Sequence, residues 1–237
     1  MERNYQSSTY TNSKNMSEIE RARSKEHVPW CEEYEMMISG MMYRSWLSAE
    51  LAAGRSRSER ICNEYNDLLQ SNNPKSGDSG NLSKKRSELL MSLLGVKAES
   101  ATIERPFSVL YGCNTDIGNN LFANVGLSID DSAFVTIGND VLIGPEVCFI
   151  TTNHPTEVSE RVGGGMYALP IEVGDACWIG ARATILPGAV IGKGCTIGAG
   201  AVVAGTIPEY SVAVGVPAKV TRKVIRADSN EDPEISK

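Results

Sequence analysis

Aliphatic side chains recur at every sixth position over the second half of the chain. One run consists of Ile179, Ile185, Ile191, Ile197 and Val203. An earlier run consists of Ile117, Ala123, Ile129 and Val135, and after a shift of two residues it continues with Ile137, Ile143 and Phe149. A period of six matches neither the 3.6-residue repeat of a helix nor the two-residue alternation of a half-buried strand. It is typical of a solenoid whose triangular coils have three short flat faces, with one hexapeptide on each face.

A small residue often follows the repeated aliphatic residue, as in Ile143-Gly144 and Ile179-Gly180. We expect the aliphatic side chains to point inward and form ladders, and the small residues to lie at tight corners where a larger side chain would crowd. The pattern predicts a mainly β fold, a left-handed parallel β-helix, over residues 104–220. An ordinary β-sandwich is the alternative, but the two-residue alternation and Asn-Gly hairpin turns typical of it are not seen in the sequence.

The pattern before the repeats is helical. Apolar residues stand at helical spacing in two groups, Tyr34, Met37, Ile38 and Met41, and then Ile61, Tyr65, Leu68 and Leu69. A break is expected at 54–58, and a third helix from Leu82 to Leu94, ended by Gly95. These features predict a small N-terminal helical cap over residues 28–103 with a flexible linker at 71–81.

Two ends and one interior stretch do not fit either pattern. Residues 1–27 carry few apolar side chains, so we expect a disordered or loosely packed tail. Residues 221–237 are expected to form a C-terminal tail. The stretch 151–170 has no hexapeptide register and predicts a loop inserted at one corner of the solenoid, where functional residues often collect.

Composition narrows the function classes. Aromatic residues make up only 6% of the 237 residues while there are 22 glycines, which favours a core of small and β-branched side chains. The formal charge of −6 gives no reason to expect a nucleic-acid or anionic membrane partner. No apolar run approaches the ~18 residues that span a bilayer. The polar start lacks a signal-peptide pattern, so we expect a cytoplasmic protein whose six cysteines are reduced.

Several motifs between Met36 and Val224 carry a family resemblance. In chain order they are Met36-Met-Ile-Ser-Gly-Met-Met-Tyr43 with Cys62-Asn-Glu-Tyr-Asn66, Tyr111-Gly-Cys-Asn114 with Ile117-Gly-Asn-Asn-Leu-Phe-Ala-Asn124, Asn153-His-Pro155, Val173-Gly-Asp-Ala-Cys-Trp-Ile-Gly180, Ile185-Leu-Pro-Gly188 and Val214-Gly-Val-Pro-Ala-Lys219. This stretch resembles the maltose, galactoside and nodulation-type sugar O-acetyltransferases, which are hexapeptide-repeat acyltransferases. The resemblance implies an acetyl-CoA-dependent O-acetyltransferase, a homotrimer with acetyl-CoA bound in a cleft between neighbouring β-helices.

His154 is the candidate catalytic residue. It is one of two histidines and lies in the predicted insertion, whereas His27 lies in the polar N-terminal segment and is given no role. An alcohol is a poor nucleophile until its proton is removed, and an imidazole suits this task at neutral pH. We expect direct attack of the acceptor hydroxyl on the thioester, because no Ser or Cys stands in a recognisable nucleophile motif.

The resemblance also implies binding residues. Asn124, Asp131 and Tyr111 match positions on the acceptor side, although Asn and Asp also occupy solenoid corners for backbone reasons. Trp178, with packing as its alternative role, is expected to line the cofactor cleft. The other residues expected on the cofactor side are Ala181, Ala199, Ala204 and Gly205 along the pantetheine arm, and Lys219 and Arg222 near the phosphates. A solvated basic tail is the alternative interpretation of the last two.

Three positions depart from the family pattern. Gly165 stands two residues before Tyr167, where the family usually has a glutamate. Leu110 replaces a residue that is commonly polar, and Gly205 replaces a lysine often found near the cofactor. The loss of polar groups at two acceptor-side positions suggests a less sugar-like, more apolar acceptor.

Other functions of the same solenoid remain as alternatives. A γ-type carbonic anhydrase needs three zinc-binding histidines, and this chain has two, so we expect no metal. The Gly165 departure is also compatible with a catalytically altered or inactive hexapeptide-repeat protein. A third alternative is a CoA-dependent transferase that acts on an amine or carries a larger acyl group.

Overall fold

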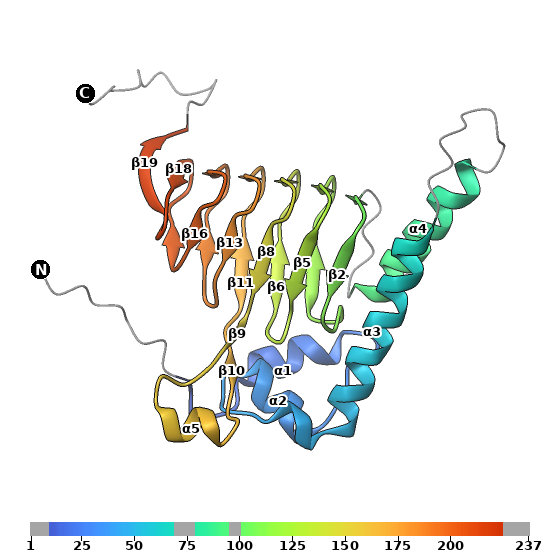
Figure 1. The fold of residues 1–237 in the computed structure, drawn as a ribbon, viewed down its shortest axis with the longest axis vertical. Helices are drawn as coiled ribbons and strands as arrows, with labels where there is room; N and C mark the ends of the chain where they lie inside the picture. Colours follow the sequence, from blue (N-terminus) through green and yellow to red (C-terminus); the bar gives the residue numbers. More distant parts are fainter. Residues whose placement is uncertain (1–9, 69–78, 95–100, 225–237) are drawn as a thin grey trace, which may run out of the picture.

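The computed structural model describes residues 10–68, 79–94 and 101–224. Over most of this range the chain winds into a left-handed parallel β-helix with three flat faces, and helices cover its beginning (Figure 1). The strands of face 1 are β1 (Thr102–Ile103), β4 (Phe122–Ala123), β7 (Leu142–Ile143), β12 (Trp178–Ile179), β15 (Thr196–Ile197), β18 (Ser211–Val214) and β19 (Lys219–Lys223). Those of face 2 are β2 (Phe107–Val109), β5 (Leu127–Asp130), β8 (Cys148–Ile150), β13 (Thr184–Ile185) and β16 (Val202–Val203). Those of face 3 are β3 (Thr115–Ile117), β6 (Val135–Ile137), β11 (Ile171–Val173), β14 (Val190–Ile191) and β17 (Thr206–Ile207).

The six-residue pattern corresponds to the core, as predicted. All residues of the two aliphatic runs are buried, and neighbouring coils place them in register, so that Ile143, Ile179 and Ile197 stack on face 1. Neighbouring coils approach each other closely at the small residues that directly follow the repeated aliphatic residues. A Cβ at Gly144 would lie 2.6 Å from the backbone nitrogen of Ala181, and one at Gly180 equally close to that of Ala199. Glycine is therefore needed at these corners for the coils to stack.

The predicted cap is present, although its helices differ in extent. The helices are α1 (Met16–Arg23), α2 (Glu32–Ile38), a 3₁₀ turn (Ser45–Leu47), α3 (Ala49–Asp67), α4 (Ser79–Leu93) and α5 (Val158–Val162). Helices α3 and α4 cover the first coil, where Ile61, Tyr65 and Leu93 join the solenoid core. The expected break at 54–58 was wrong, because α3 continues through it. Ser58 is buried and its hydroxyl donates to the Val109 carbonyl at 2.6 Å, which holds the helix against β2.

The expectation of a disordered tail over residues 1–27 was wrong for the part that the structure describes. Helix α1 begins after Asn15, whose side chain accepts from the N–H groups of Ser17 and Glu18. Its buried Ile19 and Ala22 pack into the cap core. A low-hydrophobicity segment folds here because its polar groups find partners elsewhere in the molecule. Residues 1–9 lie outside the described part.

Two other boundaries differ from the prediction. Residues 71–78 of the expected flexible linker lie outside the described residues, while 79–81 already belong to α4. The solenoid does not end at residue 220, because β19 turns back and pairs antiparallel with β18 as far as Lys223. The tail from residue 225 onward is not described.

The insertion at 151–170 has a structure of its own. It consists of β9 (Thr152–Asn153), α5 and β10 (Tyr167–Ala168), with β9 and β10 antiparallel. Tyr43 of the cap adds an antiparallel bridge to Met166, and Thr11 bridges Met41 in turn. Segments from three distant parts of the sequence thus meet below the solenoid, where Figure 1 places β9, β10, α2 and α5. No helix in the described ranges has the length and apolarity to cross a bilayer.

Candidate functional site

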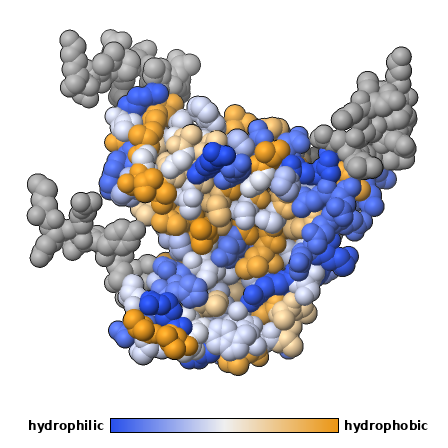
Figure 2. All heavy atoms as spheres, viewed as in Figure 1, coloured by the Kyte–Doolittle hydropathy of each residue, from blue (hydrophilic) through white to orange (hydrophobic). Residues whose placement is uncertain are grey.

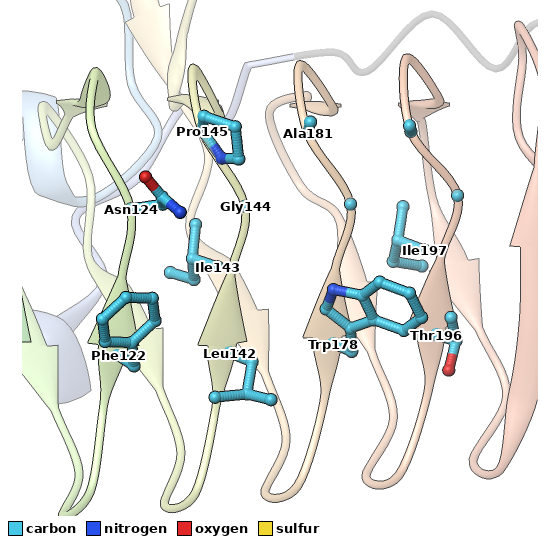
Figure 3. Close-up of a pocket in the computed structure, with 13 residues that line it drawn as sticks. Phe122, Asn124, Leu142, Ile143, Gly144, Pro145, Trp178, Ala181, Thr196 and Ile197 are labelled. Carbon is cyan, nitrogen blue, oxygen red and sulfur yellow. The ribbon is translucent and has the colours of Figure 1, made fainter.

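A groove of about 520 Å³ runs across face 1, over strands β4, β7, β12 and β15 (Figure 3). Its walls are the outward-facing residues that directly precede the buried aliphatic positions. Phe122, Leu142 and Trp178 lie in register on successive coils and are 39%, 51% and 56% exposed. Trp178 was predicted from the sequence, whereas Phe122 and Leu142 were missed. Their position one residue before a repeat aliphatic, the same as that of Trp178, is the signal that could have found them.

Small residues form the other side of the groove. Ala181 and Ala199 line it as predicted, next to Gly144 and Gly180 at the corner between faces 1 and 2. Asn124 lies at the same corner, near Pro145 in Figure 3, and its side-chain oxygen accepts from the Val125 N–H at 2.8 Å. The groove therefore has apolar walls and small residues along one side. Such a shape suits a long, thin, flexible ligand arm.

The remaining predicted cofactor residues lie elsewhere. Lys219 and Arg222 are exposed on β19, which continues the groove's sheet beyond β15 and β18. Ala204 and Gly205 are exposed in the turn between β16 and β17, at the corner between faces 2 and 3. They do not line the groove of their own chain.

Asp131 and Tyr111 do not face the groove either. Asp131 is fully buried, and its carboxylate accepts from the backbone N–H groups of Tyr111 (2.7 Å) and Gly112 (2.8 Å) and from the Thr115 hydroxyl (3.0 Å). The buried Tyr111 ring lies under the cap, and its hydroxyl accepts from Arg55 Nε at 3.1 Å. Tyr111 therefore joins the cap to the solenoid, while the hydrogen bonds of the Asp131 carboxylate lie within the solenoid itself.

Burial has the largest effect on the pKa values of Asp131 and Tyr111. It raises the pKa of Asp131 to about 6, although hydrogen bonds from Tyr111, Thr115 and Gly112 oppose the shift. Burial also raises the pKa of the Tyr111 hydroxyl above its ordinary value, against the lowering effect of the Arg55 guanidinium. A buried carboxyl group with a raised pKa makes the stability of the fold depend on pH.

His154 is exposed directly after β9. Its backbone N–H donates to the side-chain oxygen of Asn153 at 2.9 Å, and Asn153 pairs with Tyr167 of β10. On the other side, Arg161 of α5 donates to the Pro155 carbonyl at 3.1 Å. The imidazole is therefore presented to solvent by a backbone that is fixed on both sides.

The structure gives a physical reason for Gly165. Because Asn153 lies opposite Tyr167, His154 and the residues just before Tyr167 come from the same end of the β9–β10 pair. A Cβ at Gly165 would lie 2.5 Å from the sulfur of Met42, and the Trp46 ring occupies the space beside Gly164, whose φ is 77°. Cap side chains thus fill the place that a longer side chain at residue 165 would need.

The groove and His154 lie at different corners of one chain. The groove's small residues follow face 1 strands, whereas the insertion leaves the solenoid after β8 of face 2. No residue of the insertion lines the groove. Ala204 and Gly205 share the corner with the insertion, on a later coil. Residues that the sequence assigned to one site therefore lie in two separate places. One set lies along the groove, and the other, with His154, Ala204 and Gly205, lies at the corner between faces 2 and 3.

Comparison with known proteins agrees with this fold. Residues 170–205 match the bacterial transferase hexapeptide (six repeats), and residues 36–97 match the maltose acetyltransferase hexapeptide capping motif. Galactoside O-acetyltransferase of Escherichia coli K12 is 41% identical over 146 residues, which cover 62% of this chain and 72% of that protein. The solved maltose O-acetyltransferase of Clostridium difficile 630 is 32% identical with a TM-score of 0.76, over 83% of this chain and 99% of that one. The chain belongs to the hexapeptide-repeat acetyltransferases.

One solved member of the family adds chemical information. A hexapeptide-repeat acetyltransferase of Vibrio cholerae O1 biovar eltor, complexed with acetyl coenzyme A, is 29% identical with a TM-score of 0.72. The alignment covers 83% of this chain and all of that one. The chain is thus an acetyltransferase by family, and this relative binds acetyl coenzyme A. Within the described residues, no group of three or more His, Cys, Asp or Glu side chains could hold a metal ion.

Proposed function

We propose that this acetyltransferase transfers the acetyl group of acetyl-CoA to a hydroxyl of a small-molecule acceptor, with His154 as the general base. The observation that carries the proposal is the groove on face 1, with apolar walls and a row of small residues. A pantetheine arm fits such a groove, since backbone groups beside small side chains can hydrogen-bond its amides. The complex of the Vibrio cholerae relative with acetyl coenzyme A supports the same ligand.

In the proposed reaction, the neutral imidazole of His154 accepts the proton of the acceptor hydroxyl as its oxygen attacks the thioester carbonyl. A tetrahedral oxyanion forms and collapses with cleavage of the carbon–sulfur bond. The proton held by His154 then passes to the departing thiolate, so that the products are the acetyl ester and the free thiol of CoA. The fixed backbone on both sides of His154 suits this role, because a base must be held within hydrogen-bond reach of the hydroxyl.

Acetyl-CoA is proposed to bind with its arm against Trp178, Ala181 and Ala199. Lys219 and Arg222 on β19 lie on the same sheet, beyond the groove's last coil, where they could pair with the phosphates. Their exposure leaves both side chains accessible to a charged ligand.

The working enzyme is proposed to be a homotrimer. In one chain the groove lies at one corner, while His154, Ala204 and Gly205 lie at another. A neighbouring copy that presents its insertion corner to the groove would bring the two sets of predicted residues together. Burial of the exposed Phe122, Leu142 and Trp178 between copies would also remove an apolar ladder from water.

The acceptor is proposed to be less polar than a simple sugar. Met42 and Trp46 occupy the space beside Gly165 and Gly164 in which a longer, polar side chain would otherwise stand close to His154. Figure 2 shows apolar side chains over α5 at the lower left, and Val158 and Val162 there are 57% and 80% exposed. An acceptor with an apolar part next to its hydroxyl would match these surroundings.

Thiol release from acetyl-CoA tests the proposal. The assay pairs wild type and His154→Ala with a panel of sugars, polyols, apolar alcohols and amines, and it is repeated with longer acyl-CoAs. We expect an apolar alcohol to be the best acceptor and the variant to lose about 10²-fold or more in kcat, as removal of a general base does. Equal rates for variant and wild type would contradict the role of His154, and highest activity on glucose or maltose would contradict the apolar acceptor.

A further inference from the structure

The segment from residue 10 to residue 27 precedes the part of the chain that matches the maltose acetyltransferase cap, which begins at residue 36. It is nevertheless bound closely to the rest of the molecule. Arg21 donates to the Asp116 carboxylate at 2.6 Å and to the Thr136 hydroxyl at 2.7 Å, and its guanidinium lies 4.1 Å from the centre of the Phe134 ring. Lys25 pairs with the same Asp116. Helix α1 is thereby fixed to face 3 of the solenoid.

A second set of contacts fixes the start of the segment to the cap. The Thr11 backbone N–H donates to the Gly40 carbonyl at 2.9 Å, and the Asn15 N–H donates to the Ser39 hydroxyl at 2.9 Å. Lys14 pairs with Glu35 at 2.6 Å. The segment is therefore anchored along its whole length, and its first described residue is held in a defined place.

That first residue, Tyr10, contacts the insertion at two points. Its hydroxyl donates to Glu160 of α5 at 3.0 Å, and its ring centre lies 5.8 Å from that of Tyr167 in β10. In Figure 1 the start of the blue segment lies beside α5. Of these two elements, α5 follows His154 in the insertion, and β10 pairs with β9, which directly precedes His154.

From each contact a short path leads to the backbone beside His154. Next to Glu160, Arg161 donates to the carbonyls of Pro155 (3.1 Å) and Thr156 (3.3 Å). Tyr167 pairs with Asn153, whose side chain accepts from the His154 N–H. Displacement of α5 or of Tyr167 would therefore be transmitted to both neighbours of the imidazole.

We propose that residues 10–27 act as a clamp on the insertion, with Tyr10 as a positioning residue that holds the His154 backbone in its reactive place. The clamp matters for catalysis only if His154 is the base, as proposed above. Tyr10 itself touches no reacting atom. Its effect is on the geometry of the imidazole, and small misplacements of a catalytic group are costly to the rate.

Two variants of Tyr10 separate its two contacts. Tyr10→Phe removes the hydrogen bond to Glu160 and keeps the ring contact, whereas Tyr10→Ala removes both. We expect kcat to fall about tenfold in Tyr10→Ala and less in Tyr10→Phe, while the Kd for acetyl-CoA stays within about twofold of wild type. No residue of the clamp lines the groove on face 1, so this split between kcat and Kd is the signature of positioning.

Glu160 supplies a rescue experiment. Glu160→Gln keeps a side-chain oxygen that can accept from the Tyr10 hydroxyl, and it should retain most of the activity. Glu160→Ala should match Tyr10→Phe. The double variant Tyr10→Phe/Glu160→Ala should be no slower than either single variant, because both remove the same hydrogen bond. Arg23→Gln is the matched control, since the exposed Arg23 of the same segment pairs, among the residues that the structure describes, with Glu20 of its own helix alone.

A spectroscopic measurement tests the clamp without turnover. With only two histidines in the chain, the imidazole signals of His154 and His27 can be followed by NMR in each variant. We expect the His154 signal to shift or broaden in Tyr10→Ala while the His27 signal is unchanged. An unchanged His154 signal with unchanged kcat would overturn the clamp. So would a fall in kcat that is accompanied by equal losses of acetyl-CoA binding and thermal stability, since that would be simple unfolding.

His154→Ala, measured in the same series, separates the two proposals. If it abolishes turnover while the Tyr10 variants behave as wild type, the base is correct and the clamp is wrong. If it leaves turnover unchanged, the proposed base is wrong, and the NMR signals alone decide whether the clamp exists.

Discussion

Asp131 illustrates how one buried residue makes the stability of the fold depend on pH. Its carboxylate accepts hydrogen bonds from the backbone N–H groups of Tyr111 and Gly112 and from the Thr115 hydroxyl. None of its atoms is exposed. Desolvation outweighs these hydrogen bonds and leaves the pKa at about 6. The folded state therefore binds a proton over a pH range in which the unfolded chain has already lost it.

The sign of the resulting pH dependence follows from linkage. The folded-state pKa of Asp131 lies above its ordinary value of 3.8, so its contribution to stability is full below about pH 4 and is lost as pH rises toward 6. Asp131→Asn should remove this trend. The difference in free energy of unfolding between wild type and variant, measured by urea titration from pH 4 to 7, should change by up to about 3 kcal/mol.

Asp140, an aspartate at an exposed corner of the solenoid, provides the control for that experiment. Asp140 is exposed and accepts from the side chain of Asn120 on the neighbouring coil. Asp140→Asn should leave the pH dependence of stability close to that of wild type. A difference between wild type and Asp131→Asn that stays constant across the pH range would refute the assignment.

At the scale of elements, the outward-facing residues of the short strands determine the chemical character of each face. On face 1 these residues are large and apolar at Phe122, Leu142 and Trp178, and they form the groove wall. Trp178 is more than half exposed, so it contributes less to the core than its size suggests. Its main contribution should therefore be to ligand binding.

Trp178→Ala should weaken acetyl-CoA binding with little effect on stability. We expect the Kd, measured by isothermal titration calorimetry, to rise about tenfold, which corresponds to loss of about 1.4 kcal/mol of contact with an exposed aromatic ring. Val190→Ala is the matched control, because Val190 precedes a buried repeat isoleucine on face 3 in the same way. If the Trp178 variant binds acetyl-CoA as tightly as the Val190 variant, the groove is not the cofactor site.

The solenoid elements were predictable from sequence because their signal is local and repeated. Each inward aliphatic is followed by its corner residue within the same hexapeptide, so the pattern identifies the core residues directly. Helix α1 was not predictable, because the partner of Arg21 and Lys25 is Asp116, about ninety residues away in sequence. Asp131 was assigned to the acceptor side for a similar reason. The hexapeptide pattern is the same whether a corner carboxylate is exposed to solvent or buried.

At the scale of the molecule, the separation of groove and insertion has a direct consequence for assembly. Groove residues such as Ala181 lie at one corner of the triangular coil, and the proposed base His154 lies at another. Under the proposed trimer, each site takes its groove from one chain and its base from another. Two inactive variants should then restore each other.

Mixed trimers provide the measurement. Ala181→Phe should fill the groove and His154→Ala should remove the base, so each homotrimer should be inactive. Coexpression or subunit exchange in equal amounts should restore about a quarter of wild-type activity, because half of the grooves are intact and half of those meet an intact base. A mixture that remains inactive would indicate that base and groove belong to the same chain, and a monomeric mass in light scattering would contradict the trimer.

The way in which the stack of coils terminates controls whether copies can join end to end. A parallel β-helix would present unpaired backbone groups at both ends, and such edges recruit further strands. Here the amphipathic helices α3 and α4 cover the first coil, while β19 folds back antiparallel against β18 at the last. The reversal breaks the parallel register that another coil would need. We therefore expect copies not to join end to end, and deletion of β19 is the change most apt to convert the protein into a growing filament.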